Sequence, residues 1–311
     1  MKNPFQRLFD ERGLVFFDPA LATELERRGA RLSSHLWSAS LISDDPEAII
    51  EVHLGALRAG ADVISSASYQ ASRLGFSKLG LSDVEADARL TRAVTLAREA
   101  VERHGSPGRL VAASLGPYGA VLADGSEFTG DYPLSPRELA DFHAPRVEAA
   151  LKGAPDLILF ETLPSMAEAE AVARVAQQFS GVPVMASFSA KGDRLCHGER
   201  FADVVATLES VPNVIAAGLN CTAPDVIAPL LRTVPPTRLA LAASPNAGET
   251  WDATTRSWRG APYRGHDFAT LAQRYVDSGA TVIGGCCRTR PDDLAAAVKT
   301  VRPSPSRRGT S

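Results

Sequence analysis

Four cysteines carry the most specific chemistry that the side chains of this sequence could perform. Cys221 follows Asn220, and Cys286 and Cys287 follow two glycines, whereas Cys196 lies in a polar stretch, KGDRLCHGER, without a partner motif. Thiolates from Cys221, Cys286 and Cys287 could bind one Zn²⁺ and leave its fourth tetrahedral position open, as in catalytic zinc sites. The alternative is that these cysteines are small buried apolar residues, because free cysteine is often buried. Cys196 is expected to be a bystander.

The segments that end in these cysteines have the composition of buried strands. Short runs rich in Val, Ile, Leu and Ala recur along the chain, as in strands that are covered on both faces. We predict eight strands, at 14–18, 61–68, 110–116, 156–162, 183–189, 214–221, 238–245 and 281–287. The ends of the sixth and eighth strands can face a common point in a closed barrel, which would bring the three thiols together.

Helical patterns separate these strands. They cover 46–59, 83–104, 136–151, 166–179, 201–208, 224–233, 268–278 and 291–301, with stop and start signals such as Gly105 and the Ser135-Pro136 pair. This alternation predicts an α/β fold, a single (β/α)8 TIM barrel over residues 1–302. A doubly wound open sheet is the alternative, but no glycine-rich dinucleotide motif follows the first strand. Segment 118–133 is expected to be a long loop and a wall of the active site, and the tail 303–311 to be disordered.

Polar side chains stand where several predicted strands end. Asp18 ends the first strand, Glu161 lies near the end of the fourth, and Asn220 precedes Cys221 at the end of the sixth. Active sites of such barrels lie at the C-terminal ends of the strands, so these residues are candidates for one site. Each acid has an alternative role: Asp18 could cap the following helix, with Pro19 in its first turn, and Glu161 could form a structural salt bridge.

Composition narrows the class of protein. The 311 residues carry a formal net charge of −3 with no basic block, so a nucleic-acid partner is not expected. No apolar run is long enough to cross a bilayer, and the first residues lack the apolar core of a secretory signal. We therefore expect a cytoplasmic protein without a membrane partner, in which free or metal-bound thiols are favoured over disulfides.

The motifs around these residues resemble those of the homocysteine S-methyltransferase family of zinc-dependent barrel enzymes. The resemblance extends from about residue 14 to 301 and looks closest to members that use S-methylmethionine or S-adenosylmethionine. The two cysteine motifs, GLNCTAP and IGGCCRT, are its most specific part. The other matching segments are LATELERRGA, GADVISSASYQAS, AASLGPYGA, FETLPSMAEAEA and PNAGE.

The resemblance implies transfer of a methyl group from a cationic sulfonium to the thiol of homocysteine, which gives methionine. Catalytic and metal-binding roles would fall to Cys221, Cys286 and Cys287, with homocysteine sulfur as the fourth zinc ligand. A protonated thiol is a poor nucleophile, and zinc coordination deprotonates it. Asp18 and Glu161 match the family positions that hold the amino acid and could bind its ammonium. Asn220 could donate a hydrogen bond to the substrate or to a metal ligand.

One position departs from the family pattern, in which a pair of glycines follows the first-strand aspartate. Pro19 and Ala20 stand there, and proline has no N–H to offer a substrate carboxylate. A different thiol or a selenol is therefore an alternative acceptor. A zinc hydrolase is disfavoured by the all-thiolate ligands and by the absence of a His-Glu-x-x-His motif. A Schiff-base lyase would have only Lys191 near a strand end. A metal- or thiol-binding barrel without turnover is the non-enzymatic alternative.

Overall fold

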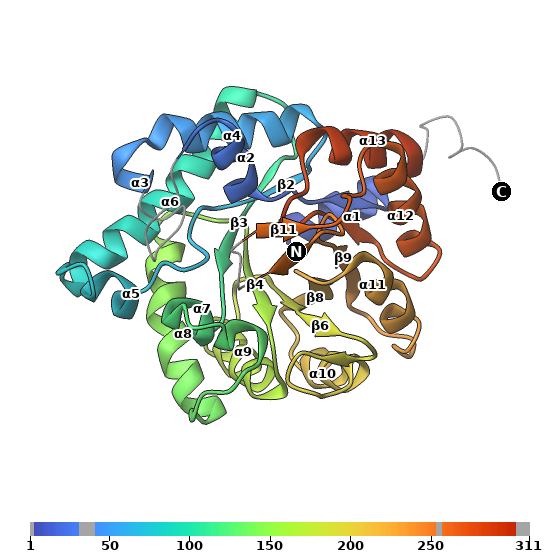
Figure 1. Ribbon diagram of the computed structural model, residues 1–311. Coiled ribbons are helices and arrows are strands. Elements are labelled where there is room, and N and C mark those ends of the chain that lie inside the picture. Colours follow the sequence, from blue (N-terminus) through green and yellow to red (C-terminus); the bar gives the residue numbers. More distant parts are fainter. Residues whose placement is uncertain (1–2, 31–40, 253–256, 303–311) are drawn as a thin grey trace.

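The structure, a computed structural model, is a barrel of eight parallel strands surrounded by helices (Figure 1), and it describes residues 3–30, 41–252 and 257–302. The strands follow one another around the barrel in chain order, and a parallel bridge between Phe17 and Val63 joins the first strand to the second. The TIM barrel prediction is thereby confirmed, and the open sheet is excluded. The barrel strands are β1 (Val15–Phe16), β2 (Val63–Ser65), β3 (Leu110–Leu115), β4 (Leu157–Leu163), β5 (Val184–Phe188), β8 (Val214–Asn220), β9 (Ala240–Ser244) and β12 (Val282–Ile283).

Each of the eight predicted helices has a counterpart on the outside of the barrel. Local capping explains several of their ends: the Asp45 side chain accepts a hydrogen bond from the N–H of Ala48, and Ser135 forms a capping box with Glu138. Gly105 ends its helix in the left-handed conformation, with φ of 74°. These helices are α4 (Pro46–Arg58), α6 (Asp83–His104), α8 (Pro136–Leu151), α9 (Met166–Gln178), α10 (Phe201–Glu209), α11 (Pro224–Leu231), α12 (His266–Val276) and α13 (Pro291–Val301).

Several further elements were not predicted, and most of them contain too few residues to show a periodic pattern. The expectation that 118–133 is a plain loop was wrong, since α7 (Tyr118–Leu122) and the 3₁₀ helix η2 (Ser126–Phe128) form there. The other additions are α1 (Pro4–Arg12), α2 (Leu21–Arg27), α3 (Leu41–Asp44), α5 (Arg73–Ser77) and two hairpins, β6 (Ala190–Lys191) with β7 (Arg194–Leu195) and β10 (Thr250–Asp252) with β11 (Ser257–Arg259). The predicted tail 303–311 lies outside the described residues, and the extent of a 1–302 domain stays a prediction.

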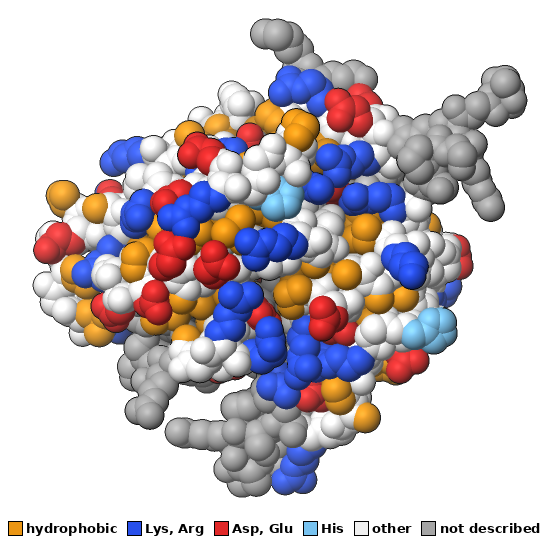
Figure 2. Space-filling model, turned by 90° about the horizontal axis from the view of Figure 1, so that it is seen from above, with side chains coloured by type: hydrophobic (Ala, Val, Ile, Leu, Met, Phe, Trp, Pro, Cys, Tyr) orange, Lys and Arg blue, Asp and Glu red, His pale blue; other side chains and the backbone are white. Residues whose placement is uncertain are grey.

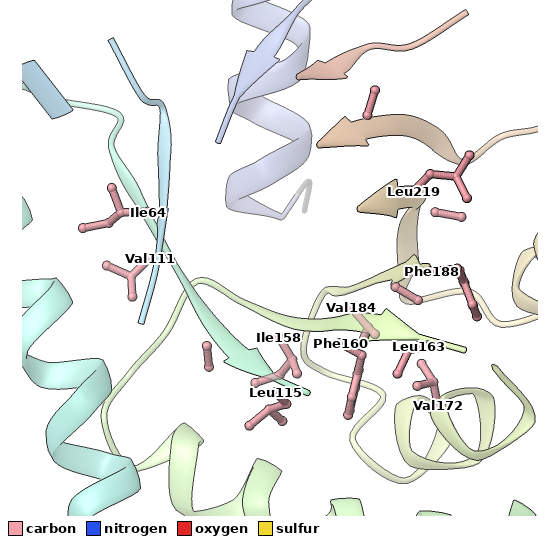
Figure 3. Close-up of a cluster of buried hydrophobic side chains, with 14 of the residues drawn as sticks. Ile64, Val111, Leu115, Ile158, Phe160, Leu163, Val172, Val184, Phe188 and Leu219 are labelled. Atoms are coloured by element: carbon pink, nitrogen blue, oxygen red, sulfur yellow. The ribbon is translucent and has the colours of Figure 1, made fainter. Parts of the chain in front are cut away.

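The strands bury apolar side chains on both faces. Outside the barrel they pack against the helices, and Figure 3 shows Leu163 of β4 beside Val172 of α9 within this layer. Inside the barrel a second cluster includes Phe17, Leu159 and Met185, and Phe5 and Leu8 of α1 pack against it. Helix α1 therefore contributes to the filling of the barrel interior, and the barrel forms a rigid support for the groups at its rim.

Charged groups secure the N-terminal ends of the strands. The buried Asp62, just before β2, accepts hydrogen bonds from Arg109 Nη1 at 2.7 Å and Arg302 Nη2 at 2.6 Å, and it also pairs with Arg12. A fourth donor is the backbone N–H of Phe16 at 3.0 Å. One carboxylate thus ties α1, β1, the residue before β3 and the end of α13 to a single point.

We expect Asp62→Asn to destabilise the fold by about 3–5 kcal/mol, because it leaves clustered guanidinium groups without their buried counter-charge. The measurement is the free energy of unfolding in urea. Asp203→Asn is the control, since its exposed side chain lies 3.9 Å from Arg200 and such pairs contribute little. Equal stability of the two variants would show that Asp62 does not secure the barrel.

The surface carries charges of both signs. On the face seen in Figure 2, acidic and basic side chains lie side by side, with hydrophobic side chains scattered among them. None of the described helices combines the length and the apolar character that a membrane crossing requires.

Candidate metal centre

The three cysteines predicted as metal ligands lie together at the C-terminal ends of the strands. Cys221 directly follows β8, and Cys286 and Cys287 lie in the turn after β12. The sulfurs of Cys221 and Cys287 are 3.5 Å apart, and all three sulfurs lie within 4.8 Å of one another. Cys196, after β7, is not part of this group, as expected for a bystander.

The spacing of the sulfurs fits a metal ion of the size of zinc. Tetrahedral Zn²⁺ with Zn–S bonds of about 2.3 Å places its sulfur ligands about 3.8 Å apart, within the observed range. Among the described residues, no imidazole or carboxylate joins the three sulfurs as a further ligand atom in this cluster. The donor set is therefore a thiolate triad that leaves room for a ligand from outside the chain.

Backbone strain accompanies this arrangement. Three residues have a positive φ, in the left-handed region that residues other than glycine rarely adopt. The values are 51° for Cys221, 63° for Thr162 and 70° for Arg288. All three residues lie at the same rim, at the ends of β8, β4 and β12. Such strain is typical of functional sites, because the surrounding structure must stabilise it.

The two glycines before Cys286 are needed for close packing and not for a left-handed backbone. Neither Gly284 nor Gly285 has a positive φ. A Cβ on Gly284 would lie 2.6 Å from Ser244 Oγ, and one on Gly285 would collide with the side chain of Thr289. Glycine is needed here because neighbouring side chains approach the backbone closely, which fixes the turn that presents Cys286 and Cys287.

Without a metal, the three thiols share their protons through sulfur hydrogen bonds. Donation to Cys286 and Cys287, together with burial, raises the pKa of Cys221 well above its ordinary value. Hydrogen bonds from Cys221 and Cys286 lower the pKa of Cys287 well below its ordinary value. The cluster is thus able to hold negative charge, and a cation that binds there displaces the remaining protons.

Asp18 lies at the same rim, after β1. It accepts hydrogen bonds from the N–H and the hydroxyl of Ser65, each at 2.9 Å. Burial is the main cause that raises its pKa to about 7, and the charge of Glu161 adds to the effect. The alternative role as a helix cap was wrong, because α2 begins at Leu21 and Ala20 occupies its cap position without a side-chain hydrogen bond.

Glu161, in β4, accepts hydrogen bonds from Ser114 Oγ and from Asn220 Nδ2, the latter at 3.2 Å. Burial raises its pKa to about 7, and the charge of Cys286 contributes. The alternative salt bridge is not formed with any residue that the structure describes. Asn220 Nδ2 also lies 3.9 Å from Cys286 Sγ, so one amide links the acid to the sulfur cluster.

Two further groups at the rim are not singled out by the sequence. They are Tyr69, after β2, and Glu127 of η2. The phenol of Tyr69 donates to Glu127 Oε2 at 3.2 Å. Burial raises the pKa of Glu127 to about 7, and the charge of Cys286 adds to this. The sequence gives no signal that separates Glu127 from Asp124 or Asp131.

The rim is an anionic site. Three carboxyl groups (Asp18, Glu127 and Glu161) accompany three thiols, and within the described ranges none of these carboxyl groups pairs with a lysine, arginine or histidine. Such a site is chemically suited to cations: a metal ion, an ammonium group or a sulfonium group.

Comparison with known proteins agrees with this geometry. The family model for homocysteine S-methyltransferase matches residues 15–301. The chain is 42% identical over 304 residues to a homocysteine S-methyltransferase from Escherichia coli, with 94% of this chain and 97% of that protein covered. It is 40% identical over 306 residues to homocysteine S-methyltransferase 1 of Zea mays, which covers 93% and 95% of the two chains.

A solved structure shares the whole fold. The crystal structure of the homocysteine methyltransferase MmuM from Escherichia coli, in its metallated form, superposes with a TM-score of 0.85 at 39% sequence identity, covering 95% of this chain and 99% of that one. The residues matched by the family model include every predicted site residue, from Asp18 to Cys287. This chain belongs to the homocysteine S-methyltransferase family of one-carbon transferases.

Proposed function

We propose that this protein transfers a methyl group from a sulfonium donor, S-methylmethionine or S-adenosylmethionine, to the thiol of homocysteine, giving methionine, with Zn²⁺ as its cofactor. The observation that carries the proposal is the convergence of three cysteine sulfurs within 4.8 Å at a rim that also holds carboxyl groups without basic partners. A site that needs free thiols suits a reducing compartment, so the proposal includes a cytoplasmic location.

Cys221, Cys286 and Cys287 would hold the zinc ion. When bound, zinc supplies the positive charge that keeps a substrate thiol ionised near neutral pH. Asn220 donates a hydrogen bond to Cys286, and the backbone at Gly284 and Gly285 is closely packed. Both features fix the positions of the sulfurs that would bind the ion.

Asp18 and Glu161 would bind the ammonium group of the acceptor. Within the described part of the chain, each accepts hydrogen bonds from neutral donors alone, Ser65 in one case and Ser114 and Asn220 in the other, so their negative charges are available to a ligand. They are close enough for the charge of Glu161 to raise the pKa of Asp18. Two carboxylates on one cation orient the amino acid and place its side chain toward the cysteines.

The reaction balances without a further reactant. The ionised acceptor sulfur attacks the donor methyl group in line, and a new carbon–sulfur bond forms. The bond to the sulfonium breaks, and its electron pair stays on the donor sulfur, which leaves as a neutral thioether. The thiol proton passes to solvent when the acceptor ionises, so the site need only orient the two substrates and exclude competing nucleophiles.

The rival reactions have weaker support. Lys191, the lysine that a Schiff-base mechanism would use, is exposed in the β6–β7 hairpin. A hydrolytic zinc site favours histidine and carboxylate ligands, whereas the described cluster contains sulfur alone.

The test of the function is a methyl-transfer assay that crosses several thiols with several donors. Homocysteine, cysteine and a selenol would be combined with S-methylmethionine, S-adenosylmethionine and the neutral donor betaine. We expect turnover with homocysteine and at least one sulfonium, and none with betaine. Zinc-loaded protein that methylates none of these acceptors would contradict the proposal. The remaining interpretation would then be a metal- or thiol-binding barrel without turnover.

Pro19 gives a specific prediction about the acceptor. It is buried between Asp18 and Ala20, and the N–H of Ala20 points to Thr289 Oγ1 at 3.3 Å. Pro19→Gly adds one backbone donor beside Asp18, so we expect about a fivefold to tenfold lower Kd for homocysteine in calorimetry of zinc-loaded protein. An unchanged Kd would show that the amides of this turn do not hold the acceptor carboxylate.

A further inference from the structure

We propose that Glu127 selects the methyl donor: its carboxylate, oriented by the Tyr69 hydroxyl, pairs with the positive charge of the sulfonium and favours cationic over neutral donors. This inference rests on the proposed function and adds to it a residue that discriminates between donor classes.

Glu127 lies near the sulfur cluster without belonging to it. Its Oε2 accepts a hydrogen bond from the Tyr69 hydroxyl at 3.2 Å. Tyr69 follows β2 and the segment of Glu127 follows β3, so both lie at the rim that holds the cysteines. The ligand atoms that could share one metal ion nevertheless include no carboxylate among the described residues. The carboxylate is thus placed to act on a ligand that approaches the metal centre.

The support of Glu127 is rigid, although it lies in a segment between strands. A Cβ on Gly119 of α7 would collide with the backbone of Ser126 and Glu127, so α7 and η2 are in direct contact. The aromatic ring of Tyr69 packs directly on Gly116, whose N–H also donates to the Tyr69 carbonyl at 2.8 Å. Both members of the Tyr69–Glu127 pair are therefore held in place before a ligand binds.

The buried Glu168 of α9 anchors the same segment at both ends. Its Oε1 accepts hydrogen bonds from the N–H of Tyr118 at 2.9 Å and from the hydroxyl of Tyr132 at 2.6 Å. Its Oε2 lies 2.8 Å from His143 Nε2. The segment from Tyr118 to Tyr132 is thereby tied to the helical layer, which makes Glu127 a fixed charge and not a mobile surface acid.

The charge of Glu127 is separate from the acceptor site. Asp18 is held by Ser65, and Glu161 by Ser114 and Asn220, whereas Glu127 is held by Tyr69. Among the described residues, no hydrogen bond joins Glu127 to either of the other two acids. In-line transfer needs the two substrates on different sides of the acceptor sulfur. With the acceptor ammonium at Asp18 and Glu161, Glu127 is the third carboxyl group that has no basic partner in the described structure, and its charge is available to the cation of the donor.

The test compares Glu127→Gln with wild type and with Asp131→Asn, which makes the same change of charge at an exposed position of the same segment. In zinc-loaded protein we expect Glu127→Gln to raise the KM for the sulfonium donor at least about tenfold. Zinc content and the Kd for homocysteine should stay within about twofold of wild type. Asp131→Asn should match wild type in all three.

A second measurement distinguishes charge recognition from a packing effect. Calorimetry would compare S-methylmethionine with methionine, which lacks one methyl group and the positive charge. Wild type should prefer the sulfonium, and Glu127→Gln should lose most of that preference. An unchanged donor KM, or a loss of homocysteine binding as large as the loss of donor binding, overturns the role of Glu127. A wild-type protein that transfers no methyl group from any sulfonium instead contradicts the proposed function, and this inference with it.

Discussion

Alanine at Cys221, Cys286 or Cys287 is expected to abolish methyl transfer and release the metal. The three sulfurs form one group within 4.8 Å, and removal of any one leaves two ligands on a site built for three. An unbound thiol has a pKa near 8.5 and is only a few per cent ionised at pH 7. Together with the lost alignment of the substrates, this predicts a fall in kcat/KM of more than about a thousandfold.

The matched control is Cys196→Ala. Its half-buried thiol lies outside the group of ligand atoms that the described residues bring together, so its removal leaves the three-sulfur site intact. Metal analysis and kinetics of the four alanine variants should separate Cys196 from the other three. Full activity in Cys286→Ala or Cys287→Ala would contradict the assignment of the site.

Glu161→Gln is expected to weaken binding of the acceptor homocysteine more than any other substitution outside the sulfur cluster. It removes a partly buried negative charge that has no basic partner in the described structure, while the side chain keeps its size. Loss of a buried charge partner typically costs 2–5 kcal/mol, so kcat/KM for homocysteine should fall about 30-fold or more. Asp18→Asn should act in the same direction, because both carboxyl groups would contact one ammonium.

Steady-state kinetics with each substrate varied in turn would test this. The defect should appear in the KM for homocysteine, with the donor KM nearly unchanged and zinc retained. Glu170→Gln, an exposed change on α9, should have no effect. A defect confined to the donor KM would assign Glu161 to the donor and overturn the ammonium site.

The barrel itself could be predicted from the sequence because its signals are local and repeated. The strand predicted at 110–116 is observed at Leu110–Leu115, and the helix predicted after Ser135 begins at Pro136. Buried parallel strands are continuous apolar runs, and helix caps depend on a few neighbouring residues. The closure between Phe17 and Val63 then follows from the number and order of the strands.

The site was predicted only in part. The cysteines could be placed because both motifs end barrel strands, whereas the partners of Asp18 depend on a contact with Ser65 across the barrel, which no local pattern reveals. Glu127 was missed for a similar reason. Its position depends on the contact of η2 with Gly119 and on the anchor at Glu168, and short turns of helix carry no periodic signal.

The most direct test of the central claim is X-ray absorption at the zinc edge of purified, zinc-loaded protein, before and after addition of homocysteine. The account predicts three sulfur neighbours from Cys221, Cys286 and Cys287 in the free protein and four in the complex, with the fourth supplied by the substrate thiol. A zinc-loaded protein whose coordination shell still has three sulfurs at saturating homocysteine would contradict it.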